Sequence, residues 1–218
     1  MRRDIVTSAV GILVLTLLLG IAYPLAVTGI SHLAFPGNAN GQQLKLRGTL
    51  VGSKIIGQQF ADPEVKHGKL VLDKNGNPVT NPDPRYFQSR PSATVPADNA
   101  AGTAFSNLGP NSVATEQAIT SNIQAYLMLE KPYVPALTAA QVPVDAADSS
   151  ASGIDPDISP ANADLQAHRI AAVRHLSRGK VMDLISKYSH GRGLGFSGEP
   201  GVNVLGLNLA LNHVSGGR

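Results

Sequence analysis

The chain has 218 residues, no cysteine, no tryptophan and a formal net charge of +3, and only 15% of its residues are charged. This length fits one domain of ordinary size with a small extension. The missing cysteines exclude disulfides, thiolate metal sites and a cysteine nucleophile, and so small a positive surplus does not support a nucleic-acid-binding surface.

The N-terminal region is strongly apolar. After Asp4, the next Asp, Glu, Lys or Arg is Lys45, and residues 5–35 contain a single histidine. As a helix, this stretch would extend about 46 Å, against a hydrocarbon core of roughly 30 Å. A secretory signal peptide is the main alternative, but its apolar part normally runs only about 7–15 residues. The sequence therefore predicts a single-span transmembrane anchor over residues 1–35.

The charges around this stretch predict its orientation. Arg2 and Arg3 precede the apolar residues, and no Lys or Arg follows before Lys45. Positive residues next to a span tend to remain in the cytoplasm. We therefore expect a cytoplasmic N-terminus and an extracytoplasmic C-terminal domain, with the plasma (inner) membrane as the location.

Two features within the span concern its packing. Pro24 removes a backbone hydrogen bond and should interrupt the helix at Tyr23-Pro24. Ala22 and Ala26 share one face, which would let a second transmembrane helix approach closely. Small residues are also common in membrane helices generally, so the pattern does not decide whether a partner helix packs there.

The remainder of the chain is expected to be a mixed, loop-rich α+β domain. Residues 36–43 (PGNANGQQ) have the composition of a linker, and residues 44–218 form the domain itself. Strands are expected at residues 50–57 and 70–72. The Asn-Gly pair within Asp73–Asn77 predicts a hairpin turn directly after the second of these strands.

Helical periodicity dominates the second half of the domain. One helix is expected from Val113 to Leu127, ended by Pro132. A second helix opens with Ser159 as N-cap and Pro160 at its first position, and Gln166 leans toward its apolar stripe. That stripe consists of Leu165, Ile170, Val173 and Leu176. A further helix is expected over residues 181–188. The segment 202–211 fits either a strand or a capped helix.

The residues that could carry chemistry are sparse. Asp155 and Asp157 flank Pro156, a pattern more typical of a turn or cap than of a calcium loop. Ser149, Ser150 and Ser152 are not set in a nucleophile elbow. These residues predict an anchored, non-catalytic domain with no metal and no cofactor of its own.

Five sequence blocks occur in an order that resembles the C subunit of the Kdp-type potassium-transporting ATPase. The blocks are Gly52–Phe60, Tyr86–Ala93, Ser106–Pro110, Ser152–Pro160 with Gln166 and Arg169, and Glu199–Asn208. The resemblance implies a heteromeric complex that is embedded in a membrane and contacts its lipid. Its other members would be a channel-like potassium-binding subunit, a P-type ATP-hydrolysing subunit and a small single-span peptide, and ATP and potassium would be handled by that complex.

The resemblance implies two different roles for such a subunit. The first is an extracytoplasmic accessory that stabilises the complex and caps or gates the side from which potassium enters. The second is a catalytic chaperone that raises the ATP affinity of the pump subunit. The predicted orientation favours the first role, because it places the domain across the membrane from ATP. A membrane-anchored periplasmic enzyme and a structural cell-envelope anchor are alternatives from other classes.

Each role has its own candidate residues. A nucleotide contact, which arises only in the chaperone role, would involve Ser152, Gly153, Asp155 and Gln166. The candidate docking residues for partner subunits are Tyr86, Phe87, Arg90, Pro91, Ser92, Asn107, Leu108, Gly109, Pro110 and Asn203. Most of the second set belongs to the segment Tyr86–Pro110, which is rich in proline and aromatic residues, and such exposed loops often carry binding functions.

Overall fold

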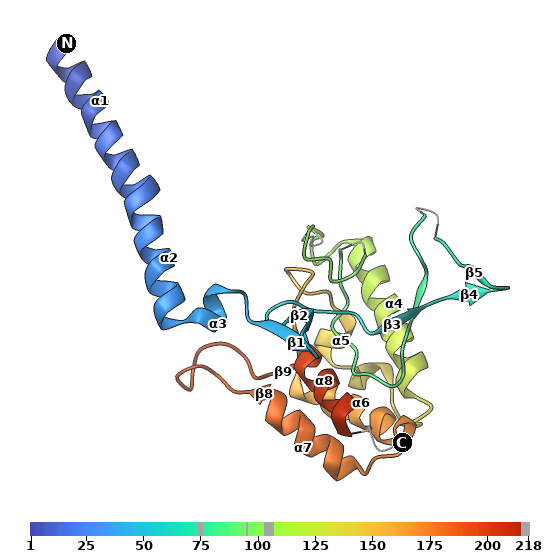
Figure 1. Cartoon of the computed structure of the whole chain (residues 1–218). Coiled ribbons are helices and arrows are strands. Elements are labelled where there is room, and N and C mark those ends of the chain that lie inside the picture. Colours follow the sequence, from blue (N-terminus) through green and yellow to red (C-terminus); the bar gives the residue numbers. More distant parts are fainter. Residues whose placement is uncertain (74–75, 95, 103–106, 215–218) are drawn as a thin grey trace. The chain divides into compact units, whose positions relative to one another are not determined.

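The structure is a computed structural model that describes residues 1–73, 76–94, 96–102 and 107–214 (Figure 1). The chain forms two compact units, Met1–Ser53 and Lys54–Arg218. The first unit contains the apolar helix and a small hairpin. The second contains mixed helices and short strands, which confirms the predicted architecture of one apolar N-terminal helix followed by an α+β domain.

The apolar helix is continuous from Arg2 to Ala34, 33 residues with a mean hydropathy of 2.5 in its most apolar window, and it is long enough to cross a membrane. It comprises α1 (Arg2–Leu17), the π-helical turn η1 (Leu18–Ala22) and α2 (Tyr23–Ala34). The expected interruption at Pro24 takes the form of this wider turn. Proline has no amide hydrogen to donate, and a π-helical turn accommodates the change in hydrogen-bond register.

The rest of the first unit is small. A one-turn helix, α3 (Pro36–Ala39), occupies the first half of the predicted linker. It leads into an antiparallel hairpin of β1 (Gln43–Leu46) and β2 (Thr49–Ser53), with an irregular register between Leu44 and Lys45. The strand expected over residues 50–57 therefore ends at Ser53.

The second unit begins with short hairpins. β3 (Ala61–Pro63) pairs with β6 (Thr80–Pro82), and β4 (Val65–Lys66) pairs with β5 (Lys69–Leu70). The predicted turn is present at both of its ends, because the Asp73 amide donates to the Asn77 carbonyl at 2.8 Å and Leu72 bridges Pro78. Asn75, the first residue of the Asn-Gly pair, lies outside the described residues.

Helices and one small sheet form the body of this unit. The helices are α4 (Val113–Glu130), η2 (Ala139–Gln141), α5 (Val144–Ala147), α6 (Pro160–Val173), α7 (Arg178–Tyr188) and α8 (Val204–Val214). The antiparallel sheet has the order β7 (Asp157–Ile158), β9 (Gly201–Asn203), β8 (Ser189–His190). All three helices expected between residues 113 and 188 are confirmed, and Ser159 caps α6 by accepting from the Asn162 amide at 3.1 Å.

The segment 202–211, left open between strand and helix, contains both. β9 ends at Asn203, whose Oδ1 accepts from the Gly206 amide at 3.0 Å and so caps the first turn of α8. Gly206 allows this turn to lie against Tyr188, because a Cβ atom there would stand 2.8 Å from the Tyr188 ring.

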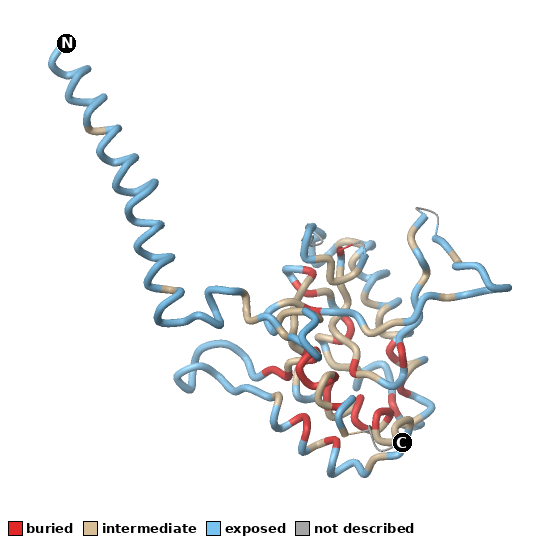
Figure 2. The backbone as a smooth tube through the Cα atoms, viewed as in Figure 1, coloured by how far each residue is buried: buried red, intermediate tan, exposed pale blue. Residues whose placement is uncertain are grey.

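The core lies where α6, α7, α8 and the short sheet meet, and it encloses Phe87 from the proline-rich segment (Figure 2). The predicted apolar stripe of α6 is confirmed for Ile170, which is buried, and for Leu165 and Leu176, which are half-buried but pack against buried clusters. The buried face of the helix also carries polar and small residues that the stripe left out, namely Asn162, Ala163, Gln166, Ala167 and Arg169. Polar side chains are tolerated on this face because they bond to one another and to nearby backbone groups.

Candidate functional site

A buried ion pair joins α6 to the end of α4. Arg169 and Glu130 both have 0% exposed side chains, and Arg169 Nε donates to Glu130 Oε1 at 2.9 Å. Burial raises the pKa of Glu130, and the guanidinium opposes that shift. Arg169 also donates from Nη1 to the carbonyls of Pro84 (2.6 Å) and Tyr86 (2.9 Å). One guanidinium thus fixes the start of the Tyr86–Pro110 segment against two helices.

Gln166 holds the next residue of that segment. Its Oε1 accepts from the Gln88 amide (2.7 Å) and from Arg169 Nη2 (2.8 Å). Its Nε2 donates to the Gln88 carbonyl (3.1 Å) and to Asn162 Oδ1 (2.9 Å). These bonds use all four hydrogen-bonding positions of a carboxamide. The predicted lean of Gln166 toward the buried side is confirmed, and a nucleotide could contact this side chain only after one of these bonds broke.

A second chain of polar contacts supports Asn162. Tyr126 Oη donates to Asn162 Oδ1 at 3.0 Å, and Asn162 Nδ2 donates to Asp145 Oδ2 at 2.9 Å. Asp145 also accepts from the Ser159 amide and hydroxyl. Burial raises the pKa of Tyr126, and the nearby Glu130 carboxylate adds to the shift. The phenol therefore stays a hydrogen-bond donor at physiological pH.

Phe87 lies in the core and is fully buried. Its amide donates to Asn208 Oδ1 (2.9 Å), and Asn208 Nδ2 donates back to its carbonyl (2.9 Å). The side chain predicted to dock a partner is therefore not available for that role in the folded domain. Its neighbour Tyr86 is half-buried between the Phe60 ring, 5.1 Å away, and the Arg174 guanidinium, 4.7 Å from its centroid.

Residues 149–155, the serine-rich segment, pack against residues 90–92 of the proline-rich segment Tyr86–Pro110. Arg90 Nη1 donates to Asp155 Oδ2 at 2.9 Å, Ser92 Oγ donates to the Gly153 carbonyl, and the Ser150 amide donates to the Pro91 carbonyl. Gly153 is buried with φ of 72°, a conformation that favours glycine. Ser152 is exposed, and its hydroxyl accepts from the Ile154 amide. The structure thus brings together predicted residues from both candidate sets.

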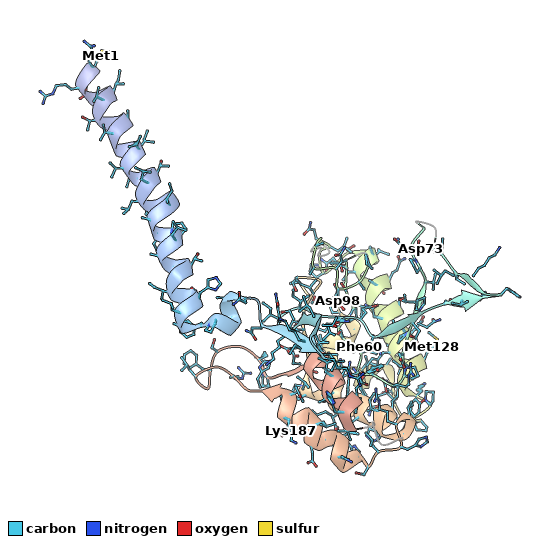
Figure 3. All side chains as sticks on the ribbon, viewed as in Figure 1. Met1, Phe60, Asp73, Asp98, Met128 and Lys187 are labelled. Atoms are coloured by element: carbon cyan, nitrogen blue, oxygen red, sulfur yellow. The ribbon has the colours of Figure 1, made fainter. Side chains whose placement is uncertain are left out.

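Gly57 and Asp98 complete this packing. The Gly57 amide donates to the Ile154 carbonyl, and a Cβ atom on Gly57 would stand 2.6 Å from the Asp155 carbonyl oxygen. Asp98, labelled in Figure 3, lies against Gly57 as well, because its Oδ1 would stand 2.9 Å from the same Cβ atom. Burial, with a smaller effect of the Asp155 charge, raises the pKa of Asp98 to about 6.

Replacing Asp98 by Asn should stabilise the protein at neutral pH. The raised pKa means that the folded state keeps a proton that the unfolded state has lost, so the contribution of this carboxyl group to stability is fully present below about pH 4 and is lost as the pH rises through about 6. With solvent screening, the cost above that range is about 1–2 kcal/mol. Urea unfolding of the full chain in detergent should show that gain for Asp98→Asn at about pH 8 and a far smaller one at about pH 4. An equal gain in stability at both pH values would contradict the raised pKa of Asp98.

Two hollows open beside the packed segments. The first, of about 340 Å³, has Arg90 and Pro91 on one wall, with Tyr126, Asn162 and Gln166 among its other lining residues. The second, of about 440 Å³, is lined by Leu108, Pro110, Thr115, Ile119 and residues 148–151. Candidate docking residues line both hollows, and residues 148–151 line the second one, where the Ser150 amide donates to the carbonyl of Pro91 from the first.

The remaining predicted residues support their surroundings. Asn107 and Gly109 are exposed, and the Gly109 carbonyl accepts from the Ser112 amide (3.0 Å) just before α4. Asn203 Nδ2 donates to the Lys54 carbonyl (2.8 Å) and to Asp157 Oδ1 (3.2 Å). Asp155 accepts from the Asp157 amide in a turn. Within the described residues, no group of three or more His, Asp or Glu side chains is suited to a metal ion.

The fold and the site define a protein with one N-terminal helix that is long and apolar enough to cross a membrane, and an α+β domain in which buried polar side chains hold residues 84–88. A protein-family profile described as "KdpC: K+-transporting ATPase, c chain" matches residues 5–213. The chain therefore belongs to the KdpC family. This confirms the predicted family, which is that of a subunit of a larger ATPase and not of a separate enzyme.

Curated relatives agree over nearly the full length. The chain is 45% identical over 202 residues to the potassium-transporting ATPase KdpC subunit of Methylococcus capsulatus, covering 92% of this chain and 93% of the relative. It is 40% identical over 215 residues to that of Bradyrhizobium diazoefficiens, covering 99% of both. The subunit of Mycobacterium tuberculosis is 41% identical over 214 residues, covering 98% of this chain and all of the relative.

Proposed function

We propose that this protein is a non-catalytic accessory subunit of an ATP-driven potassium import complex, anchored by its N-terminal helix and folded on the extracytoplasmic side. In this role it stabilises the assembly and covers the side from which potassium enters. The single observation that carries the proposal is the match to the KdpC family over residues 5–213. The flanking residues Arg2 and Arg3 support the orientation.

The docking surface proposed for the partner subunits is the pair of hollows around Arg90, Pro91, Leu108 and Pro110. Two features support it. Arg169, Gln166 and Asn208 hold residues 84–88, directly before Arg90 and Pro91, so this part of the surface is presented with little loss of conformational freedom on binding. Leu108, 47% exposed beside the second hollow, offers an apolar contact that a partner would cover.

The partners proposed are the channel-like potassium-binding subunit, the P-type ATP-hydrolysing subunit and the small single-span peptide. Potassium selection and ATP hydrolysis belong to those chains, so this subunit needs no cofactor of its own. The full set of bonds on Gln166 favours this role over a nucleotide-contacting chaperone, because the side chain already serves to hold Gln88.

Co-purification tests the proposal. An affinity-tagged chain, extracted from membranes in mild detergent, should bring down the other subunits. Leu108→Glu should reduce their recovery about tenfold or more, because a carboxylate would be desolvated at the contact. The matched control is Leu70→Glu, since Leu70 is 54% exposed on the β4–β5 hairpin. Extraction of the unmodified chain alone would overturn the subunit role, whereas full recovery with Leu108→Glu would overturn only the docking surface.

A further inference from the structure

The loop between β8 and β9 presents two large apolar side chains to solvent. Every residue from Gly191 to Pro200 is exposed, and the loop extends away from the body of the domain (Figures 1 and 2). Leu194 is 90% exposed and Phe196 is 76% exposed. Only Gly195 separates them, so this exposed loop carries two large apolar residues within three positions, unlike the single exposed apolar residues that are common on protein surfaces.

Hydrogen bonds give this loop a defined shape. Gly193 and Ser197 bond reciprocally through their amides and carbonyls at 2.7 and 2.8 Å, and the Phe196 amide donates to the Gly193 carbonyl at 3.2 Å. Arg192 and Glu199 form an ion pair of 2.6 Å at the base. Leu194 has a φ of 53°, which is unfavourable for a residue with a side chain. The loop is therefore built to hold its apolar residues outward.

A lipid surface fits this projection better than a protein surface does. A stable protein interface needs a broad area around its apolar residues, whereas a tip with two side chains among glycine and serine can enter the interfacial region of a bilayer. The membrane-spanning helix also keeps the domain permanently close to lipid, so that even weak insertion is effective through high local concentration.

The charge of the adjoining helix agrees with a lipid partner. Arg178 and Arg192 are paired with Asp164 and Glu199, and the same stretch also carries the exposed Lys180 and Lys187. Lys187, near the end of α7 that leads into the loop, is exposed (Figure 3). Basic residues next to an apolar tip add attraction to anionic lipid headgroups.

We propose that the loop Gly191–Pro200 is a second membrane contact, in which Leu194 and Phe196 insert among lipid chains while α7 meets the headgroups. The first contact is the spanning helix, and the second would fix the tilt of the domain against the bilayer. This inference depends on the span and not on the proposed docking surface.

The absence of cysteine from the sequence allows a direct test. A nitroxide label is placed on Phe196→Cys or Leu194→Cys in the full chain, reconstituted in phosphatidylcholine vesicles with and without phosphatidylglycerol. Its collision rates with oxygen, which concentrates in lipid, and with a water-soluble nickel chelate are then measured by electron paramagnetic resonance. Met128→Cys is the matched control, because Met128 is a 74% exposed apolar residue on α4 (Figure 3).

The ratio of the oxygen collision rate to the nickel collision rate should be about tenfold higher for the labels at 194 and 196 than for the label at 128. The reason is that burying such a side chain favours the inserted state by at least that factor. The anionic lipid should increase the difference. Equal nickel access at all three positions would overturn the proposal. Protection from nickel that appears only when the other subunits are co-reconstituted, with no rise in oxygen collisions, would also overturn the proposal and assign the loop to a protein partner.

Discussion

Arg169→Met should lower the free energy of unfolding by about 3–5 kcal/mol, because removal of one partner leaves a buried charge without compensation. The Glu130 carboxylate would lose its guanidinium, since its Oε1 bonds to Arg169 and its Oε2 has no partner among the described residues. The carbonyls of Pro84 and Tyr86 would also lose a donor. Urea unfolding of the full chain in detergent, followed by tyrosine fluorescence, measures the change.

Two further variants show whether the charge or its geometry matters. The double variant Glu130→Leu with Arg169→Met should recover part of the loss, since an apolar pair avoids the cost of burying charge. Arg169→Lys should stay destabilised, because an ammonium group lacks the planar fork that reaches Glu130, Gln166 and two carbonyls at once. A loss below about 1 kcal/mol for Arg169→Met would contradict the structural role assigned to the pair.

Phe87→Ala should cost about 3–5 kcal/mol of stability, as expected for a large aromatic side chain removed from a core. Phe87 is fully buried and packs in the cluster formed by α6, α7 and α8. The matched control is Phe196→Ala, which removes the same atoms from a 76% exposed position and should change stability by less than about 0.5 kcal/mol. The same urea titration serves for both variants. A Phe87→Ala variant of normal stability that loses its partner subunits would restore the docking role for this side chain.

The regular elements could be predicted from local patterns. The span follows from the absence of charge between Asp4 and Lys45, and the start of α6 follows from Ser159-Pro160, because a cap and a proline act within one turn of the chain. The burial of Gln166 also follows from its helical spacing. These predictions share one property: the information lies within a few residues of the feature.

The site could be predicted only in part, because long-range pairings determine it. Phe87 occurs in an irregular segment with no periodicity to mark it as buried, and its backbone bonds to Asn208, far along the chain. The ion pair of Arg169 with Glu130 likewise joins two helices. A buried polar face resembles an exposed one in sequence, so the apolar stripe predicted for α6 includes Ile170 but misses the buried Asn162 and Arg169. The alternation of Asn, Ala, Gln, Ala and Arg on one helix face was the available signal.

The proposed accessory role requires the domain to lie on the extracytoplasmic side of the membrane. A cysteine at Val144, 80% exposed on α5, can be treated with a membrane-impermeant maleimide in intact spheroplasts and after lysis. Labelling should be equal before and after lysis, because an extracytoplasmic domain is reachable from outside. Labelling that appears only after lysis would place the domain in the cytoplasm, contradict the accessory role on the potassium side, and return the nucleotide-contacting role to consideration.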